Sequence, residues 1–160
     1  MGKVLFLVIL VGGGWYAHQR WVAVSPAYQT YQRYAEARAR QEWKTLDALA
    51  DGVAADELEQ MKGTYATQHV EVYGQAYALP APSVADVAGS VAWIDYQRES
   101  EESAGSGFVN LVAVQTVCRI PPGVTSAMCK WPVSFRHEVE LAEVDGAWLV
   151  ESFSEERITP

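Results

Sequence analysis

The chain has 160 residues, of which 49% are hydrophobic and 20% charged, and its formal net charge is −8. This composition is globular and excludes a wholly disordered chain, and the length suffices for one domain of ordinary size. The acidic balance repels phosphate backbones and anionic lipid headgroups, which argues against a nucleic-acid partner and against electrostatic docking on a membrane. Any contact with membrane lipid is therefore expected to be apolar.

The chain begins with an apolar run at residues 4–17. A helix of this length spans about 21 Å, but extension to Val24 gives about 31 Å, close to the thickness of the bilayer hydrocarbon. We therefore predict an N-terminal single transmembrane anchor at residues 1–24. Arg20 would reach the lipid headgroups, beside aromatic side chains that favour the membrane interface, namely Trp15, Tyr16 and Trp21.

Three consecutive glycines interrupt this run, Gly12, Gly13 and Gly14. Small residues let membrane helices approach closely, so the glycines suggest packing against a helix of another membrane subunit. They are equally compatible with a flexible end of the apolar run. Two further interpretations stay open: a cleaved signal peptide, for which only residues 23–25 offer a weak cleavage site, and a buried core helix of a soluble protein.

The sequence contains features that favour each of the two sides of the membrane for the C-terminal domain. The arginines that follow the run at positions 20, 33, 38 and 40 would keep the C-terminal domain in the cytoplasm under the positive-inside rule. A single lysine before a short apolar run is instead how export signals begin, and the two cysteines also favour export. We expect a single-pass protein of the bacterial inner membrane with a periplasmic C-terminal domain, and the cytoplasmic orientation remains open.

Two helices are predicted next. Ser25 is a good N-cap and Pro26 suits the first helical position, and apolar residues then recur at helical spacing as far as Ala50. This pattern predicts one long amphipathic helix over residues 26–50, ended by Asp51 and Gly52. A shorter helix is predicted over residues 54–62.

The rest of the chain has β character. Residues rich in Val, Tyr and Thr, or alternating between apolar and polar, predict strands at residues 64–79, 90–98, 108–120, 130–143 and 147–153. The acidic stretch ESEESAGSG at residues 99–107 is predicted to be a solvated hairpin loop. Helices followed by antiparallel strands indicate an α+β domain in which the long helix covers one face of the sheet.

The segment FRHEVELAEVDGAWLVESFS at residues 135–154 resembles the terminal hairpin of the NTF2-like, cystatin-related superfamily. In that hairpin an acidic residue and a glycine form the turn, and a tryptophan opens the next strand, as Asp145, Gly146, Trp148 and Val150 do here. The resemblance implies an NTF2-like curved antiparallel sheet packed on a long helix, over residues 25–160. Members include isomerases, dehydratases, cyclases, ligand-binding proteins and non-catalytic assembly domains, some of them tethered to membranes.

We expect Tyr31, Trp93 and Trp148 to line the space between helix and sheet. His137 shares an apolar strand face with Phe135 and Val139, and Asp95 is expected on the same face of another strand as Val91 and Trp93. A carboxylate and an imidazole in such a pocket are suited to general acid–base catalysis on a hydrophobic substrate. The competing interpretation is that His137 is a hydrogen-bonded core residue and that Asp95 lies at a strand end. No local motif carries a catalytic position over from a known family.

Metal and cofactor sites are not expected. The three histidines are His18, His69 and His137, which lack ligand spacing, and neither glycine-rich stretch forms a phosphate loop. Cys118 and Cys129 flank a turn, so they are placed either to form a disulfide or to remain two buried thiols.

The leading hypothesis is a non-catalytic accessory or scaffold subunit of a bacterial membrane protein complex. Membrane lipid and other membrane subunits are its expected partners. The alternatives are an isomerase- or dehydratase-type enzyme using Asp95 and His137, and a periplasmic small-ligand-binding protein.

Overall fold

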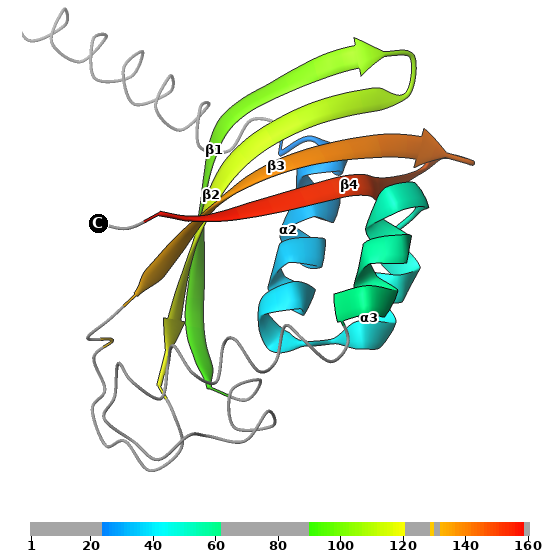
Figure 1. The fold of residues 1–160 in the computed structure, drawn as a ribbon. Coiled ribbons are helices and arrows are strands. Elements are labelled where there is room, and N and C mark those ends of the chain that lie inside the picture. The colour runs from blue at the N-terminus through cyan, green and yellow to red at the C-terminus, as the bar shows by residue number, and fades with distance from the viewer. Residues whose placement is uncertain (1–23, 62–89, 121–128, 130–131, 159–160) are drawn as a thin grey trace, which may run out of the picture.

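The computed structural model describes residues 24–61, 90–120, 129 and 132–158, and shows an α+β arrangement (Figure 1). The named elements are α2 (Pro26–Arg40), α3 (Trp43–Leu49), β1 (Val91–Gly105), β2 (Phe108–Arg119), β3 (Val133–Val144) and β4 (Ala147–Ile158). Residues 52–61 are also helical. The four described strands form one antiparallel sheet in the order β1-β2-β3-β4, and α2 and α3 lie on the same side of it. The predicted α+β class is confirmed.

Helix α2 begins where the sequence predicts. The hydroxyl of Ser25 accepts a hydrogen bond from the backbone N–H of Tyr28 at 3.0 Å, and Pro26 opens the helix. The same hydroxyl donates to the carboxylate of Glu101 on β1. The N-terminal turn of α2 is thus attached to the sheet through the residue that caps it.

The single helix predicted over residues 26–50 is wrong. Gln41 adopts a left-handed conformation with φ of 56° and separates α2 from α3. The N–H groups of Gln41 and Glu42 donate to the carbonyls of Arg38 and Ala37, which is the Schellman motif that ends many helices. The motif usually has glycine at this position, so the sequence offered no stop signal.

The core lies between the helices and the sheet. Tyr31 and Leu46 from the helices and Leu141 and Val150 from the sheet are each 0% exposed and belong to one cluster. Burial alternates along β3 from Val133 to Leu141, so the predicted half-buried strand is confirmed. The strand starts at Val133, and β4 continues to Ile158, five residues beyond its predicted end.

The tight turn between β3 and β4 forms as predicted. Asp145 and Gly146 both have positive φ, 51° and 81°, as two-residue hairpin turns require. Its glycine tolerates this conformation at little cost because it lacks a Cβ atom. The turn therefore sets the register in which Trp148 lies opposite Glu143.

The acidic hairpin loop predicted at residues 99–107 is wrong, because β1 continues through it to Gly105. Residues 100–103 pair with Val109–Val112 of β2, and only Ser106 and Gly107 form the turn. The glutamates are compatible with a strand here because β1 lies at one edge of the described sheet, where charged side chains remain solvated.

Several predictions concern residues outside the described ones. These are the anchor at residues 1–24 apart from Val24, its glycines Gly12, Gly13 and Gly14, its interfacial residues Trp15, Tyr16, Arg20 and Trp21, and the strand at residues 64–79. Within the described residues, the helices are too short or too polar to cross a membrane.

Candidate functional site

A chain of buried polar side chains joins α2 to β3 and β4. The hydroxyl of Tyr31 lies 3.0 Å from Nδ1 of His137, and Nε2 of His137 lies 3.3 Å from Oε2 of Glu155. The same Glu155 oxygen lies 3.9 Å from Nε of Arg38, one helical turn beyond Tyr34 on α2. We call these four residues, Tyr31, His137, Glu155 and Arg38, the polar chain.

Aromatic rings enclose the polar chain. The Phe153 ring lies 4.7 Å from the His137 ring and 5.2 Å from the Tyr34 ring, measured between centroids. The guanidinium carbon of Arg38 lies 4.5 Å from the centroid of Phe153, a cation–π geometry. Tyr96 on β1 meets Tyr31 edge to face at 6.0 Å. The polar groups are therefore held in an apolar, water-poor environment.

This environment controls the protonation of the polar chain. Burial lowers the pKa of His137, against the opposing effect of the hydrogen-bonding and charged Glu155, while Arg38 lowers it further. Burial also raises the pKa of Tyr31 well above its usual range. Both effects favour the neutral forms, so a neutral imidazole and a neutral phenol form the link between α2 and β3.

The fold places a phenol, an imidazole and a carboxylate next to one another in the order that a proton relay would need. Tyr31 and His137 are each 0% exposed, however, and Glu155 is the more accessible end, with 16% of its side chain exposed. A general acid or base must reach the proton of its substrate. The polar chain is thus arranged to connect helix and sheet rather than to meet a substrate in this conformation.

The structure does not bring Asp95 and His137 together. A register shift between Val91 and Trp93 changes which β1 side chains face the helices, so Ile94 and Tyr96 point inward. Asp95 is exposed and lies opposite Thr116, whereas His137 is buried on the other face. The strand-face prediction that united the two residues is therefore wrong, because a bulge interrupts the alternation on which it relied.

The three predicted pocket residues have different positions. Tyr31 belongs to the core, and Trp148 is half-buried and packs against the same core. Trp93 is 42% exposed on the outer face, which we define as the face of the sheet opposite α2 and α3. Among the described residues, the side chains of Tyr28, Tyr96 and His137 pack around Tyr31.

Two polar residues that the sequence analysis did not identify hold the carbonyls of α2. Gln115 donates to the carbonyl of Ala35 at 2.9 Å, and Arg119 donates to that of Ala39 at 2.6 Å. Both lie on β2 and are almost fully buried. Glu155 was missed because β4 was predicted to end before it, and polar residues inside an apolar strand were the available signal for Gln115 and Arg119.

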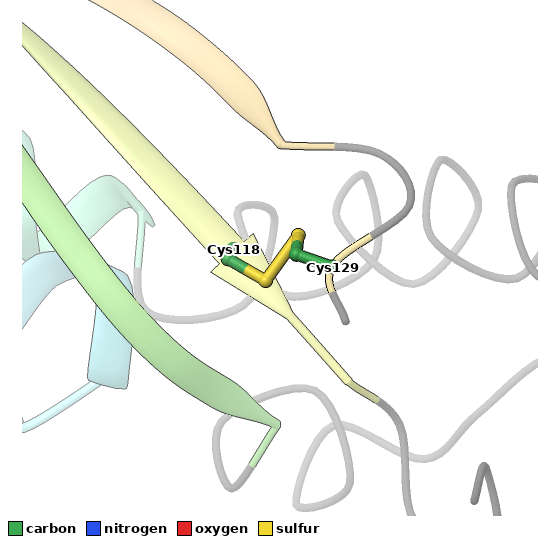
Figure 2. Close-up of a disulfide and its surroundings, with 2 residues drawn as sticks. All are labelled: Cys118 and Cys129. Carbon is green, nitrogen blue, oxygen red and sulfur yellow. A yellow bond between two sulfur atoms is a disulfide. The ribbon is translucent and has the colours of Figure 1, made fainter. Parts of the chain in front are cut away.

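Cys118 and Cys129 form a disulfide, with their Cα atoms 5.9 Å apart (Figure 2). The bond joins the C-terminal end of β2 to Cys129, which precedes β3 in the chain. The sequence left open a disulfide or two buried thiols, and the disulfide is confirmed. The bond closes a loop that contains Pro121 and Pro122, and both prolines lie outside the described residues.

A depression of about 360 Å³ lies beside outward-facing residues of β2, β3 and β4, and Val139 and Phe153 of the core also line it. Its polar lining comes from β2, β3, β4 and the helix at residues 52–61, and consists of Asn110, Glu138, Glu140, Ser152, Ser154 and Glu57. The hydroxyl of Ser154 also reaches the carbonyl of Glu138 at 3.5 Å. Within the described residues, histidine, cysteine and carboxylate side chains form no group suited to a metal ion.

Comparison with known proteins leaves the family open. No family model and no curated protein matches the chain. A ketosteroid isomerase-like protein from Erwinia carotovora atroseptica is similar in structure, with a TM-score of 0.49, 14% identity, and coverage of 84% of this chain and 95% of that one.

An NTF-2-like protein of unknown function from Shewanella oneidensis has a TM-score of 0.48 and 9% identity, and the match covers 81% of this chain and 95% of that one. The VirB8 protein of Agrobacterium tumefaciens has a TM-score of 0.45 and 12% identity, covering 84% of this chain and 92% of that one. The chain is thus similar to NTF2-like and ketosteroid isomerase-like structures. At these identities and TM-scores the similarities do not assign an activity to it.

Proposed function

We propose that this chain is a non-catalytic accessory subunit of a bacterial membrane assembly, with an NTF2-like domain outside the cytoplasm. The observation that carries the proposal is the packing of the described side chains between α2 and the sheet. Tyr31, His137 and Phe153 occupy this space with at most 5% of each residue exposed. An enzyme or a carrier of this architecture needs a cavity for its ligand there. A packed interior instead suits a domain that acts through its surface.

The disulfide supports an extracytoplasmic location. Structural disulfides persist in oxidising compartments such as the bacterial periplasm and are rare in the cytoplasm, where thiols are kept reduced. Cys118 and Cys129 are the only two cysteines of the chain, so the bond leaves no thiol for other chemistry. The proposed periplasmic domain is therefore consistent with the complete cysteine content.

The apolar N-terminal run supports attachment to the membrane. With Ser25 held by Glu101, an anchor at residues 1–24 would leave the domain from a fixed point beside β1 rather than through a loose linker. A fixed exit suits a subunit that must present its domain at a defined orientation within an assembly.

The two alternatives have weaker support. The enzyme alternative required Asp95 and His137 to converge, and they lie on opposite faces of the sheet. The ligand-carrier alternative required a sizeable apolar cavity, whereas six of the eight residues that line the depression are polar, the others being Val139 and Phe153. Neither alternative has a described cavity that reaches the polar chain.

The proposal is tested in intact cells. A membrane-impermeant thiol reagent is applied after reduction of the outer compartment alone, and the modified chain is detected by its gel shift. We expect Cys118 and Cys129 to react only after reduction, and the chain to remain in the membrane fraction at alkaline pH. Cysteines that react only after the inner membrane is permeabilised would refute the periplasmic location.

The assembly is tested by native electrophoresis of membranes solubilised in mild detergent. We expect the chain to migrate in a discrete complex with other subunits. A chain that migrates only as a monomer, both in native membranes and after chemical crosslinking, would refute the proposed role.

A further inference from the structure

The β1–β2 and β3–β4 turns lie at the same end of the sheet (Figure 1). Five apolar residues gather on the outer face at that end. Phe108 lies opposite Ala142, Ala142 lies opposite Leu149, and Val144 lies opposite Ala147 in the next row. We call them the hairpin-end patch. They face away from α2 because they alternate with residues that contact the helix side, such as Leu141, which is 0% exposed in the core.

Two large apolar side chains of the patch are exposed. Phe108 is 42% exposed and Val144 is 40% exposed, Ala147 is exposed, and Leu149 is half-buried. Exposed apolar patches rimmed by polar residues mark interaction sites on soluble domains. The patch spans three adjacent strands: Phe108, Val144 and Ala147 are its exposed residues, and Ala142, which is 5% exposed, lies between Phe108 and Leu149.

The depression of the outer face adjoins the patch. The next row of outward-facing residues after Phe108 and Ala142 is polar. In this row Asn110 is opposite Glu140, and Glu140 is opposite Ser152. All three residues line the depression, together with the carboxylates of Glu57 and Glu138. An apolar surface and a carboxylate-lined hollow therefore lie about 7 Å apart along the strands.

We propose that this combined surface docks a segment of another protein that carries apolar side chains beside a lysine or an arginine. The apolar side chains would cover Phe108, Val144 and Leu149, and the cation would enter the hollow near Glu140. The described lining of the hollow holds three carboxylates and no cationic side chain, and Arg136 beside it pairs with Glu138 and Glu99. Charge complementarity thus selects a basic partner.

The same charges disfavour two other occupants. A second copy of this chain docked face to face would bring its Glu138 and Glu140 against those of the first, and like charges at an interface are unfavourable. A lipid surface rich in anionic headgroups would be repelled by the same carboxylates. Only a cationic protein segment satisfies both the apolar and the acidic parts of the surface.

This inference rests on the proposed function, because it assigns to an assembly subunit the surface that meets its neighbour. The test is site-specific photocrosslinking in cells with the full-length chain, using p-benzoylphenylalanine in place of Phe108. The matched control places it at Trp93, which is also aromatic, outward-facing and 42% exposed, but which lies opposite Cys118 near the other end of β2. The crosslinked peptides are then mapped by mass spectrometry.

We expect position 108, and not position 93, to crosslink to one segment that contains apolar residues and a lysine or an arginine. Glu140→Lys should lower the crosslinking yield about tenfold, and replacing the partner's cation with glutamate should restore it. Asp95→Lys, a charge reversal elsewhere on the outer face, should leave the yield unchanged.

Four outcomes would overturn the docking surface: no adduct at position 108, equal adducts at both positions, an adduct with lipid or a second copy of the chain, or a segment without a cation. If native electrophoresis still shows a discrete complex in any of these cases, only the surface is refuted. If no complex forms with the natural chain, the proposed function fails, whatever the crosslinking result.

Discussion

The hydroxyl of Tyr31 lies 3.0 Å from Nδ1 of His137, between α2 and the middle of β3, and both side chains are 0% exposed. Neither group can exchange its partner for bulk water, so the bond is expected to fix the position of α2 along the sheet. Removing one partner leaves the other buried without its hydrogen bond, which is costlier than the bond itself is favourable.

We therefore expect Tyr31→Phe to lower the free energy of unfolding by about 1–3 kcal/mol, although it removes a single oxygen atom. Urea denaturation measures the change. In a double-mutant cycle with His137→Phe, the second substitution should cost less in the Tyr31→Phe background, because the shared hydrogen bond is already lost. Strictly additive losses would contradict a direct interaction between the two side chains.

Stability should depend on pH through His137. Burial lowers the pKa of this residue in the folded protein, so above about pH 6.5, where the unfolded histidine is also neutral, the group makes no pH-dependent contribution. As the pH falls below that value, the unfolded state binds a proton that the folded state does not. The free energy of unfolding should then decrease by at most about 1.4 kcal/mol per pH unit until the folded pKa is reached.

The control for this pH dependence is His137→Gln, which keeps a polar side chain of similar size but cannot titrate. Its stability should change less than that of the natural chain between pH 6.5 and 5, as judged by urea midpoints across the range. Parallel profiles for the two proteins would mean that other groups, such as Glu155, dominate the pH dependence.

The disulfide should stabilise the domain chiefly by restricting the unfolded chain. Replacing Cys118 and Cys129 with serine together should cost on the order of 3 kcal/mol for a closed loop of this size. A reductant should destabilise the natural chain by a similar amount and leave the double variant unaffected. Equal stability of both proteins without reductant would show that the bond restricts little of the unfolded ensemble.

Substitutions at two glycines, Gly146 and Gly52, allow the cost of backbone strain to be measured apart from the cost of a steric collision. Gly146 has φ of 81°, and an added Cβ would meet nothing within 4 Å, so Gly146→Ala should cost about 1–2 kcal/mol from the left-handed backbone alone. At Gly52 the φ is 48° and an added Cβ would collide with the carboxylate of Glu151.

Gly52→Ala should therefore cost more than Gly146→Ala, and Glu151→Ala should recover the difference. Thermal denaturation of the three variants measures this order. A loss at Gly52 that does not depend on residue 151 would instead assign the whole effect to the backbone.

Local chemistry was sufficient for several elements. Ser25 and Pro26 marked the start of α2, and Asp145 with Gly146 marked the β3–β4 turn, because each pair fulfils a backbone requirement without help from the rest of the chain. The alternation from Val133 to Leu141 correctly placed His137 on the buried side of β3. Strand period alone decides this where no bulge intervenes.

The rest was decided by a helix end that no glycine marks and by pairing between distant segments. The left-handed Gln41 is stabilised by carbonyls of its own helix, yet no glycine announced it, and the acidic residues after Glu99 became a strand because Val109–Val112 supplied a pairing partner. The shift between Val91 and Trp93 moved Asp95 to the outer face. A bulge changes every later side chain on its strand, so an error of one residue reverses the assignment of a site.

From sequence alone, the chain was identifiable as an α+β domain with His137 on the apolar face of a strand and with two cysteines flanking a turn, since these follow from periodicity and spacing; the structure decided that the cysteines are bonded. Tyr31, one partner of that histidine, lies 106 residues before it on α2, and Glu155, the other partner, lies on the neighbouring strand. Only the packing of α2 across the sheet brings the three side chains together. Spacing along a chain describes one element at a time, whereas a site is formed by the geometry between elements.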